Sequence, residues 1–359
     1  MKRPLLIFVL FVLLGASFDV SAAPDTKREP FDAGELIIGK VLDSHEWNIA
    51  KIGDTYITIP LPVILFYEGK LYVFLSSKFN QGKSSHQGFM LSSEGSIKSK
   101  IVRASPDGLT PDPNPGLLIN LSITKVGLSV IIISLLLCIV LVSVGNSYKK
   151  ASGLGVPKGL ARAFEPIVEF VRKEIALSAI GKKHYKRFLP YLLSLFFFIF
   201  FANLFSLLPF FPGGANVTGN ISVTLVLALF TFFTTQIFAT KGYWKHIFNT
   251  PGVPVFLKMP IPLMPIIEVV GVIVKPFVLM IRLFANMTAG QMSIFGFLCL
   301  IFVLGNLSTI MGYAISPISL FFLVFMNFLK ILVAFLQAYV FTLFSALFFG
   351  MAVPDDDHH

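Results

Sequence analysis

The chain has 359 residues, of which 55% are hydrophobic and only 13% are charged. This leaves too little polar surface to cover the core of a soluble domain, so the lipid bilayer is the expected solvent for most of the chain. The net charge of +10 is carried by a few basic segments between apolar runs, which indicates membrane topology and no nucleic-acid partner. The two cysteines lie inside apolar runs without a CxxC pair, so no disulfide, metal site or cofactor is expected.

Residues 1–23 have the three parts of a secretory signal peptide. Lys2 and Arg3 precede a short apolar stretch, and small residues follow up to Ala22 and Ala23. The apolar stretch is too short to span a bilayer comfortably. We therefore expect cleavage near Ala22 or Ala23 and a mature N-terminus outside the cytoplasm, with an uncleaved signal anchor as the alternative.

Residues 24–116 are polar and mixed in composition, which is typical of an extracytoplasmic region. Apolar and polar residues alternate over 56–59 and 70–75, with Glu68 and Gly69 before the second run, so short strands and a hairpin are predicted. Residues 104–116 contain too much Pro, Gly and Asp for a helix or a central strand and indicate a linker.

Three membrane helices are predicted next, at 117–144 and as a hairpin over 189–240. The loop between them, 145–188, is rich in Lys and Arg and is therefore expected in the cytoplasm, as is the second basic loop at 241–261. Within the first loop, residues 164–171 have helical amphipathic spacing and predict either a helix on the membrane surface or a solvated connector. The turn of the hairpin, at 212–216, has no basic residue and is expected outside.

Residues 262–350 contain two further apolar stretches, 262–304 and 314–350, joined by a Gly/Asn/Ser turn at 305–312. Each stretch is roughly twice the length of a perpendicular span of about 20 residues, so the helices are expected to tilt steeply, break, or lie along the bilayer plane. Residues 351–359 form a tail to which no function is assigned. The predicted fold is an all-α polytopic membrane protein with about five membrane helical segments, plus a small extracytoplasmic β-containing region.

Charged residues are scarce in this apolar part, which makes each informative. Arg282 lies far inside the 262–304 stretch, where an arginine costs about 2.5 to 3.5 kcal/mol on insertion scales and normally faces a partner or a wet cavity. Glu268, Lys275 and Arg282 recur at seven-residue intervals and form one polar stripe, with Asn286 a turn further on. Gln291 is rotated by about 180° from Arg282 and is expected to point toward another element.

Further polar residues form a second candidate set. Asn327, Lys330 and Gln337 share a face of the last helix, and the two stripes face each other if the helices form an antiparallel hairpin. Asn203 and Ser206 lie in a Phe-rich span and could line a wet path. The alternative for all of these is hydrogen bonding that holds the helices together.

Arginine keeps its proton at biological pH, so Arg282 cannot carry a proton itself. Its expected role is electrostatic: it lowers the pKa of a mobile carboxylate and blocks the direct passage of ions. Glu268 is the one carboxylate between residues 189 and 353, and it lies about 20 Å from Arg282 along the same helix. The mobile carboxylate is therefore expected from another chain.

The run over 275–290, KPFVLMIRLFANMTAG, closely resembles the signature of subunit a of the rotary F-type ATP synthase. The resemblance extends to 190–192, 203–204, 208–209, 220–224 and 336–341, and it covers roughly residues 160–350. The bacterial form with a signal peptide and an enlarged N-terminal segment is similar to residues 1–116.

This resemblance implies a stator subunit that clasps a ring of c subunits with two tilted helices. Two offset half-channels then lead protons to the carboxylates of the ring, and Arg282 matches the family's essential arginine between them. Glu268, Asn203, Asn286 and Gln337 fall on polar channel or interface positions, and Gln291 and Lys330 fall where many members have an acidic residue or histidine. The implied partners are the c-subunit ring, b-type peripheral stalk subunits, the F1 sector indirectly and membrane lipid, in a bacterial inner membrane.

Two other classes of protein fit these residues less well. A self-contained secondary transporter or channel usually has internal repeats, and the two halves of this chain have none. A membrane enzyme needs a cluster of catalytic or metal-binding side chains, which the apolar part lacks. The choice between proton and sodium stays open, because the resemblance implies that the ion is selected mainly by the ring.

Overall fold

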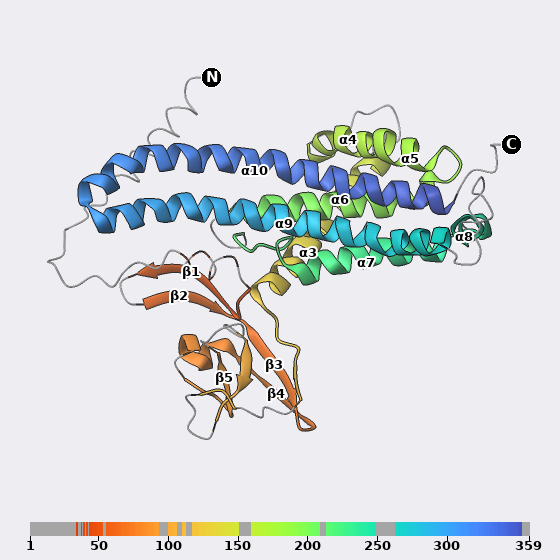
Figure 1. Ribbon diagram of the computed structural model, residues 1–359. Helices are drawn as coiled ribbons and strands as arrows, with labels where there is room; N and C mark the ends of the chain where they lie inside the picture. Colours follow the sequence, from red (N-terminus) through yellow and green to blue (C-terminus); the bar gives the residue numbers. More distant parts are fainter. Residues whose placement is uncertain are drawn as a thin grey trace.

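The computed structural model describes residues 34, 37, 39, 41, 43–52, 55–82, 84–92, 100–105, 110–112, 117–150, 159–208, 213–248 and 263–353. They form a small β-rich N-terminal region and a bundle of long helices (Figure 1). The predicted signal peptide at 1–23, part of the linker at 104–116 and most of the tail at 351–359 lie outside the described residues.

The N-terminal region consists of short antiparallel strands. They are β1 (Glu46–Ile52), β2 (Thr55–Pro60), β3 (Pro62–Tyr67), β4 (Lys70–Leu75), β5 (Phe89–Leu91), β6 (Ile101–Arg103) and β7 (Leu118–Asn120), with a 3-10 helix η1 (Ser76–Gly82) after β4. β1 pairs with β2, β5 pairs with β6, and β3 lies between β4 and β7. The β3–β4 turn at Glu68 and Gly69 has positive φ at both residues, as a tight two-residue hairpin requires.

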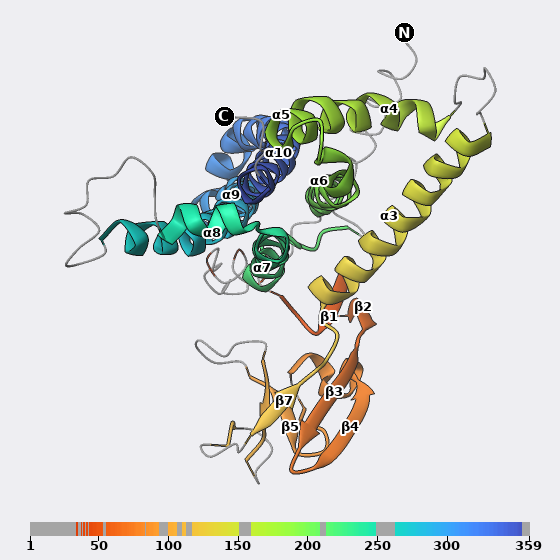
Figure 2. The ribbon, with the colours of Figure 1, turned by 90° about the vertical axis from the view of Figure 1, so that its right-hand side faces the viewer.

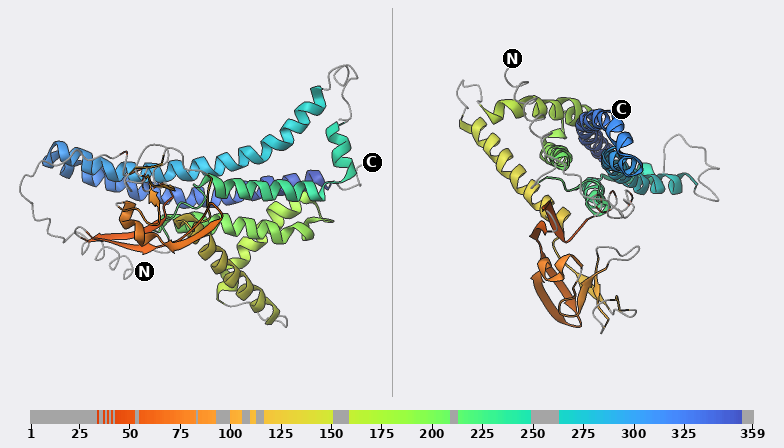
Figure 3. Two further views of the ribbon diagram at one scale, coloured as in Figure 1. Left: turned by 90° about the horizontal axis from the view of Figure 1, so that it is seen from below. Right: turned by 90° about the vertical axis from the view of Figure 1, so that its left-hand side faces the viewer.

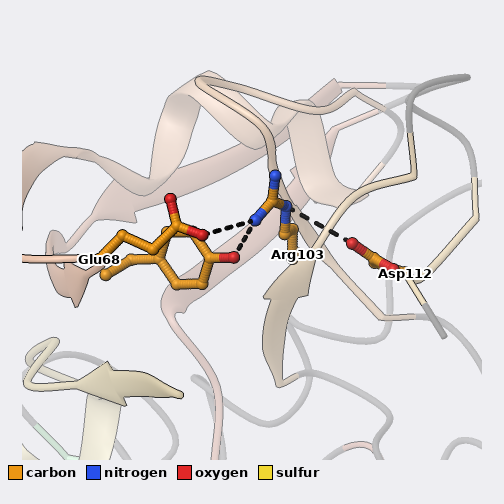
Figure 4. A network of polar contacts seen from close by, with 4 residues as sticks. Glu68, Arg103 and Asp112 are labelled. Atoms are coloured by element: carbon orange, nitrogen blue, oxygen red, sulfur yellow. Dashed lines mark hydrogen bonds and ion pairs between the residues drawn. The ribbon is translucent and has the colours of Figure 1, made fainter. Parts of the chain in front are cut away.

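This region has a hydrophobic core of its own. Val63, Leu65, Phe79 and Phe89 are buried together. At one side of the region the Arg103 guanidinium lies within 3.5 Å of carboxylate oxygens of Glu68 and Asp112, and it donates a hydrogen bond to the Tyr67 hydroxyl (Figure 4). These contacts join the β3–β4 turn to the end of β6.

The first membrane helix begins later than predicted. Helix α3 spans Lys125–Lys150, whereas the sequence predicted a span at 117–144. The apolar residues after 116 belong first to β7, which pairs with β3, so one apolar run serves a strand and a helix in turn. The Asp43 carboxylate accepts a hydrogen bond of 3.1 Å from the backbone N–H of Val126 and so satisfies an otherwise unpaired donor in the first turn.

The basic loop after α3 contains helix rather than a solvated connector. Helix α4 (Leu160–Phe170) continues through a π-helical segment, η3 (Val171–Leu177), into α5 (Ser178–Ile180), and it buries Val171 and Ile175 against the bundle. Its outer face carries Glu169, whose carboxylate lies 2.8 Å from Lys173 Nζ and 2.9 Å from Arg172. The hydrogen bond from Lys173 holds the pKa of the Glu169 carboxyl below its ordinary value.

The bundle itself is built from α6 (Tyr185–Leu207), α7 (Ile221–Phe238), the short α8 (Lys241–Phe248), α9 (Leu263–Leu307) and α10 (Thr309–Ala352). α9 and α10 lie side by side as an antiparallel hairpin, with α6 against α10 and α7 against α9, while α3 crosses the bundle obliquely (Figures 1 and 2). The start of α9 diverges from α10 toward α8 (Figure 3). Phenylalanine fills much of the interior, as in the stacked pair of Phe188 and Phe349.

Four described helices, α3, α6, α7 and α10, are long and apolar enough to cross a membrane. The fifth expected segment is α9, a helix of 45 residues that contains Glu268, Lys275 and Arg282. At about 1.5 Å per residue, α9 is about 68 Å long, more than twice the roughly 30 Å of the hydrocarbon core. Both α9 and α10 continue through their internal prolines, Pro276 and Pro317, so neither helix breaks, although a break was one of the three predicted outcomes.

The connection between these two helices is shorter than predicted. The sequence indicated a turn over 305–312, but α9 reaches Leu307 and α10 starts at Thr309, which leaves Ser308 alone between them. Gly305 and Gly312 make this possible, because a Cβ on Gly312 would lie 2.8 Å from the Gly305 Cα. The small residues of the run allow close helix contact instead of forming a loop.

Candidate functional site

Arg282 and Asn286 lie on an exposed face of α9, one turn apart. The Arg282 guanidinium carbon is 5.2 Å from the centre of the Phe344 ring on α10, a distance at which the ring face attracts a cation. Leu283 and Met287, the neighbours of these two residues, are buried in the bundle. Lys275, two turns before Arg282 on α9, is exposed as well, so this free face of the helix carries Lys275, Arg282 and Asn286 among apolar side chains.

Gln291 points into the protein from another side of α9, as the helical spacing predicts. Its side chain is 5% exposed, and its Oε1 atom has no hydrogen-bond partner within the described part of the chain. Lys330 of α10 lies beside it and is 6% exposed. The aliphatic stem of Lys330 packs on Gly290, where an added Cβ would lie 3.2 Å from the Lys330 Cε. Gly290 therefore makes room for a buried lysine between the two long helices.

Gln291 and Lys330 line a cavity of about 670 Å³ at the junction of the bundle and the N-terminal region. α6 contributes Ser206 to the wall, and α10 adds Asn327. This volume has space for several water molecules, and the wall offers enough polar groups to hold them. Only the second of the two predicted polar stripes reaches this cavity, through Asn327 and Lys330. Gln291 joins them from the other face of α9, and no residue of the first stripe lines the cavity.

The remaining wall of this cavity was missed from the sequence. It comes from Gly39, Ser44, Glu46 and Trp47 of the N-terminal region and from Lys125 at the start of α3. These residues belong to no recognisable motif. They are also too far from the bundle residues along the chain for helical or strand periodicity to link the two groups. The density of polar residues in 43–47 is the one signal that the sequence offered.

Asn203 connects three elements rather than lining the cavity. Its side chain is 1% exposed; Nδ2 donates to the Ala334 carbonyl of α10 at 3.5 Å, and Oδ1 accepts a hydrogen bond from the Thr218 hydroxyl. Ser206 donates to the Asn203 carbonyl at 2.6 Å. Gln337, two turns after Lys330 on α10, is buried as well. Asn203 therefore fits the alternative interpretation of these polar residues, in which they hold the helices together by hydrogen bonds.

Glu268 lies near the opposite end of α9, half-buried beside α8. Burial raises the pKa of the Tyr243 hydroxyl on α8, and the negative charge of Glu268 adds to this rise. Twenty-three residues of α9 separate Glu268 from Gln291, which corresponds to about 35 Å along the helix axis. Glu268 and the cavity are thus two separate polar sites at two ends of the bundle.

Comparison with known families decides what this bundle is. Residues 128–350 match the family model described as ATP synthase A chain. The chain belongs to the ATP synthase subunit a family. Residues 36–116, which contain β1 to β6, match a model described as a domain of unknown function.

Individual members of the subunit a family are similar over the same extent. ATP synthase subunit a of Chloroherpeton thalassium is 43% identical over 245 residues, which is 67% of this chain and 69% of the relative. ATP synthase subunit a 2 of Prosthecochloris aestuarii is 42% identical over 67% of this chain and 71% of its own length. ATP synthase subunit a of Myxococcus xanthus is 42% identical over 68% and 78%, respectively.

Proposed function

We propose that this chain is the stator channel subunit of the Fo motor of ATP synthase. It provides two offset proton half-channels to the carboxylates of a c-subunit ring, and Arg282 prevents ions from passing directly between them. The single observation that carries this proposal is the division of α9: Arg282 is on an exposed face, whereas Gln291 and Lys330 line a polar cavity inside the bundle.

The outer half-channel corresponds to the 670 Å³ cavity. Its polar wall contains Ser206, Gln291, Asn327 and Lys330, and it lies at the end of α6 that adjoins the non-basic outer turn. The inner half-channel corresponds to the surroundings of Glu268, beside α8 in the second basic loop. Two polar sites toward opposite ends of the bundle, separated along α9 by a stretch that contains Arg282, match two half-channels that do not meet.

Arg282 has the properties of a barrier rather than of a carrier. A guanidinium does not release its proton at biological pH, and it is costly on a surface that otherwise faces lipid. A mobile carboxylate that reaches Arg282 is stabilised in its ionised form and gives up its proton. The described part of the chain offers no carboxylate on this surface near Arg282, so the ring must supply it.

The further partners follow from membership of this complex. We expect the free face of α9 and α10 to contact the c ring, α3 and the basic loops to contact b-type stalk subunits, and the F1 sector to be reached only indirectly. The chain itself is then the ion-translocating part, in a bacterial inner membrane, and the nucleotide chemistry takes place elsewhere in the complex.

The proposal is tested with Arg282→Ala in the assembled complex. We expect loss of both ATP synthesis and ATP-driven proton pumping in membrane vesicles, because the ring carboxylate then lacks the charge that ionises it. Ser293→Ala is the matched control, since this exposed serine of α9 donates only to the Ala289 carbonyl of its own helix, at 2.9 Å. An assembled Arg282→Ala complex that still pumps and synthesises would overturn the proposal.

A further inference from the structure

The N-terminal region is fastened to the bundle at the edge of the outer cavity. The Asp43 carboxylate accepts hydrogen bonds from the Val126 N–H at 3.1 Å and from the Asn220 side chain at 3.5 Å, so it connects the starts of α3 and α7. The Lys125 N–H donates to the Ser44 carbonyl at 2.8 Å. Residues 43 and 44 are thereby tied to the ends of two membrane helices.

Trp47 completes this attachment. Its indole is 4% exposed and packs with Ile133 of α3, Ala202 of α6 and Val217 of the outer turn. Glu46 stands between these fixed points as the first residue of β1, where it pairs with Pro60 of β2. Its backbone carbonyl also accepts a hydrogen bond of 2.7 Å from the Ser44 hydroxyl. The position of Glu46 in the cavity wall is therefore set from both sides.

Glu46 is the one carboxylate in the described lining of this cavity. The charged groups that share the wall are Lys125 of α3 and Lys330 of α10, and the α6 and α9 contributions, Ser206 and Gln291, cannot titrate at biological pH. The buried, unpartnered Gln291 Oε1 atom is an acceptor that water in the cavity would satisfy. The wall thus holds two lysines and amides, with Glu46 as its one carboxylate within the described lining.

We propose that Glu46 is the proton-accepting group of the outer half-channel and that the N-terminal region is thereby part of the translocation path. This inference rests on the proposed function. The Glu46 carboxylate takes a proton from water at the outer side, becomes a neutral acid, and then releases the proton to water inside the cavity, which restores the carboxylate. The negative charge of Glu46 also offsets the repulsion that Lys125 and Lys330 exert on an entering proton.

The test compares Glu46→Gln, Glu46→Asp and Glu68→Gln in the assembled complex, with ATP synthesis driven by an imposed proton gradient across vesicles. Glu68 is the matched control, because it is an exposed carboxylate of the same region at the β3–β4 turn, in contact with Arg103 (Figure 4). We expect Glu46→Gln to lower the synthesis rate by about tenfold or more, since a positioned acid–base group typically contributes about 10²- to 10⁴-fold. Glu46→Asp should recover most of this rate, and Glu68→Gln should behave as the wild type.

A second readout separates proton transfer from a structural role. The synthesis rate of the wild type should depend on the outer pH through the titration of Glu46, and this dependence should shift in Glu46→Asp and flatten in Glu46→Gln. Glu46→Gln complexes that assemble normally and keep the wild-type rate and pH profile would overturn the inference. A rate lowered equally in Glu46→Gln and Glu46→Asp with an unchanged pH profile would also overturn it, because the effect would then be structural.

The Arg282→Ala complex keeps this inference distinct from the proposed function. If Arg282→Ala abolishes synthesis while Glu46→Gln leaves it unchanged, the stator function stands and the role of Glu46 fails. If Arg282→Ala retains synthesis, the stator function itself fails. Glu46→Cys adds an independent check of access: a membrane-impermeant thiol reagent should abolish the residual synthesis of this variant and leave the wild type, with Cys138 and Cys299, unaffected.

Discussion

Asn203 illustrates how much one buried polar side chain holds together. It accepts from Thr218 in the outer turn and donates to the Ala334 carbonyl of α10, while it belongs to α6 itself. In a membrane protein such hydrogen bonds replace part of the hydrophobic attraction that holds soluble helices together. The polar residue therefore sets the distance between α6 and α10 in the part of the bundle next to the outer cavity.

We predict that Asn203→Ala lowers the free energy of unfolding by about 1 to 3 kcal/mol, because the buried Thr218 hydroxyl loses its acceptor. Denaturant titration of the purified chain in detergent measures this. Asn286→Ala is the control, since Asn286 is exposed on α9 and its loss should change stability by less than about 0.5 kcal/mol. Equal effects of the two variants would contradict the assigned role of Asn203.

For individual residues, the sequence predicted the direction in which a side chain points better than the groups that it contacts. Helical spacing alone correctly separated the directions of Arg282 and Gln291 on α9. The same argument grouped Asn203 with the candidate channel residues, although it makes interhelical bonds, and it could not detect Glu46. That residues 46 and 330 line one cavity depends on how distant segments fold together, which no periodicity within either segment records.

Among the elements, the last turn of α10 is the most tightly constrained. Gly350 lies against the backbone of α5: a Cβ added there would be 2.0 Å from the Ala179 carbonyl oxygen. Only a residue without a side chain allows the two helices to approach this closely. Since α5 ends the helical segment of the first basic loop, this contact fixes that loop against the end of α10.

We expect Gly350→Ala to cost about 1 to 3 kcal/mol of stability, because α5 and α10 must separate to accommodate the methyl group. Gly145→Ala in α3 is the matched control: nothing lies within 4 Å of its added Cβ. That substitution should be neutral or stabilise by up to about 1 kcal/mol through helix propensity. Denaturant titration of both variants checks the pair, and a stable Gly350→Ala protein would show that the helices do not meet there.

The elements also show where sequence-based prediction has its limit. The two long helices follow from uninterrupted apolar composition, and their existence was predictable. The helix ends were less predictable. The start of α3 was not predictable, because the apolar residues of 117–123 serve equally well in β7 and in a membrane helix, and the junction of α9 and α10 was not, because Gly305 and Gly312 allow close packing as well as a turn. In both cases tertiary contacts decide between local structures that the sequence permits equally.

Over the whole molecule, the N-terminal region and the bundle are joined through few but well-buried contacts. Trp47 is the largest of them, and it packs on residues from α3, α6 and the outer turn. The second tryptophan, Trp244 of α8, is 41% exposed. We therefore expect Trp47 to contribute much to stability and Trp244 to contribute little.

Trp47→Ala should lower stability by about 3 to 5 kcal/mol, the usual cost of removing a large buried aromatic side chain. Limited proteolysis of the complex should then release the N-terminal region faster than in the wild type. Trp244→Ala should leave the proteolysis rate near that of the wild type. Equal protection of the region in both variants would mean that Trp47 does not attach it.

The attachment also determines the order in which the protein is completed during its synthesis. Asp43 and Asn220, which are hydrogen-bonded to each other, are separated by 177 residues, and Trp47 packs on Val217. Residues 43–47 leave the ribosome early, but their binding site does not exist until the outer turn has been translated and α3 and α6 are in the bilayer. The β-rich region has its own core and can fold first. The cavity is therefore completed late, although the segment that supplies part of its wall is made early, so a partly synthesised chain lacks this enclosed space.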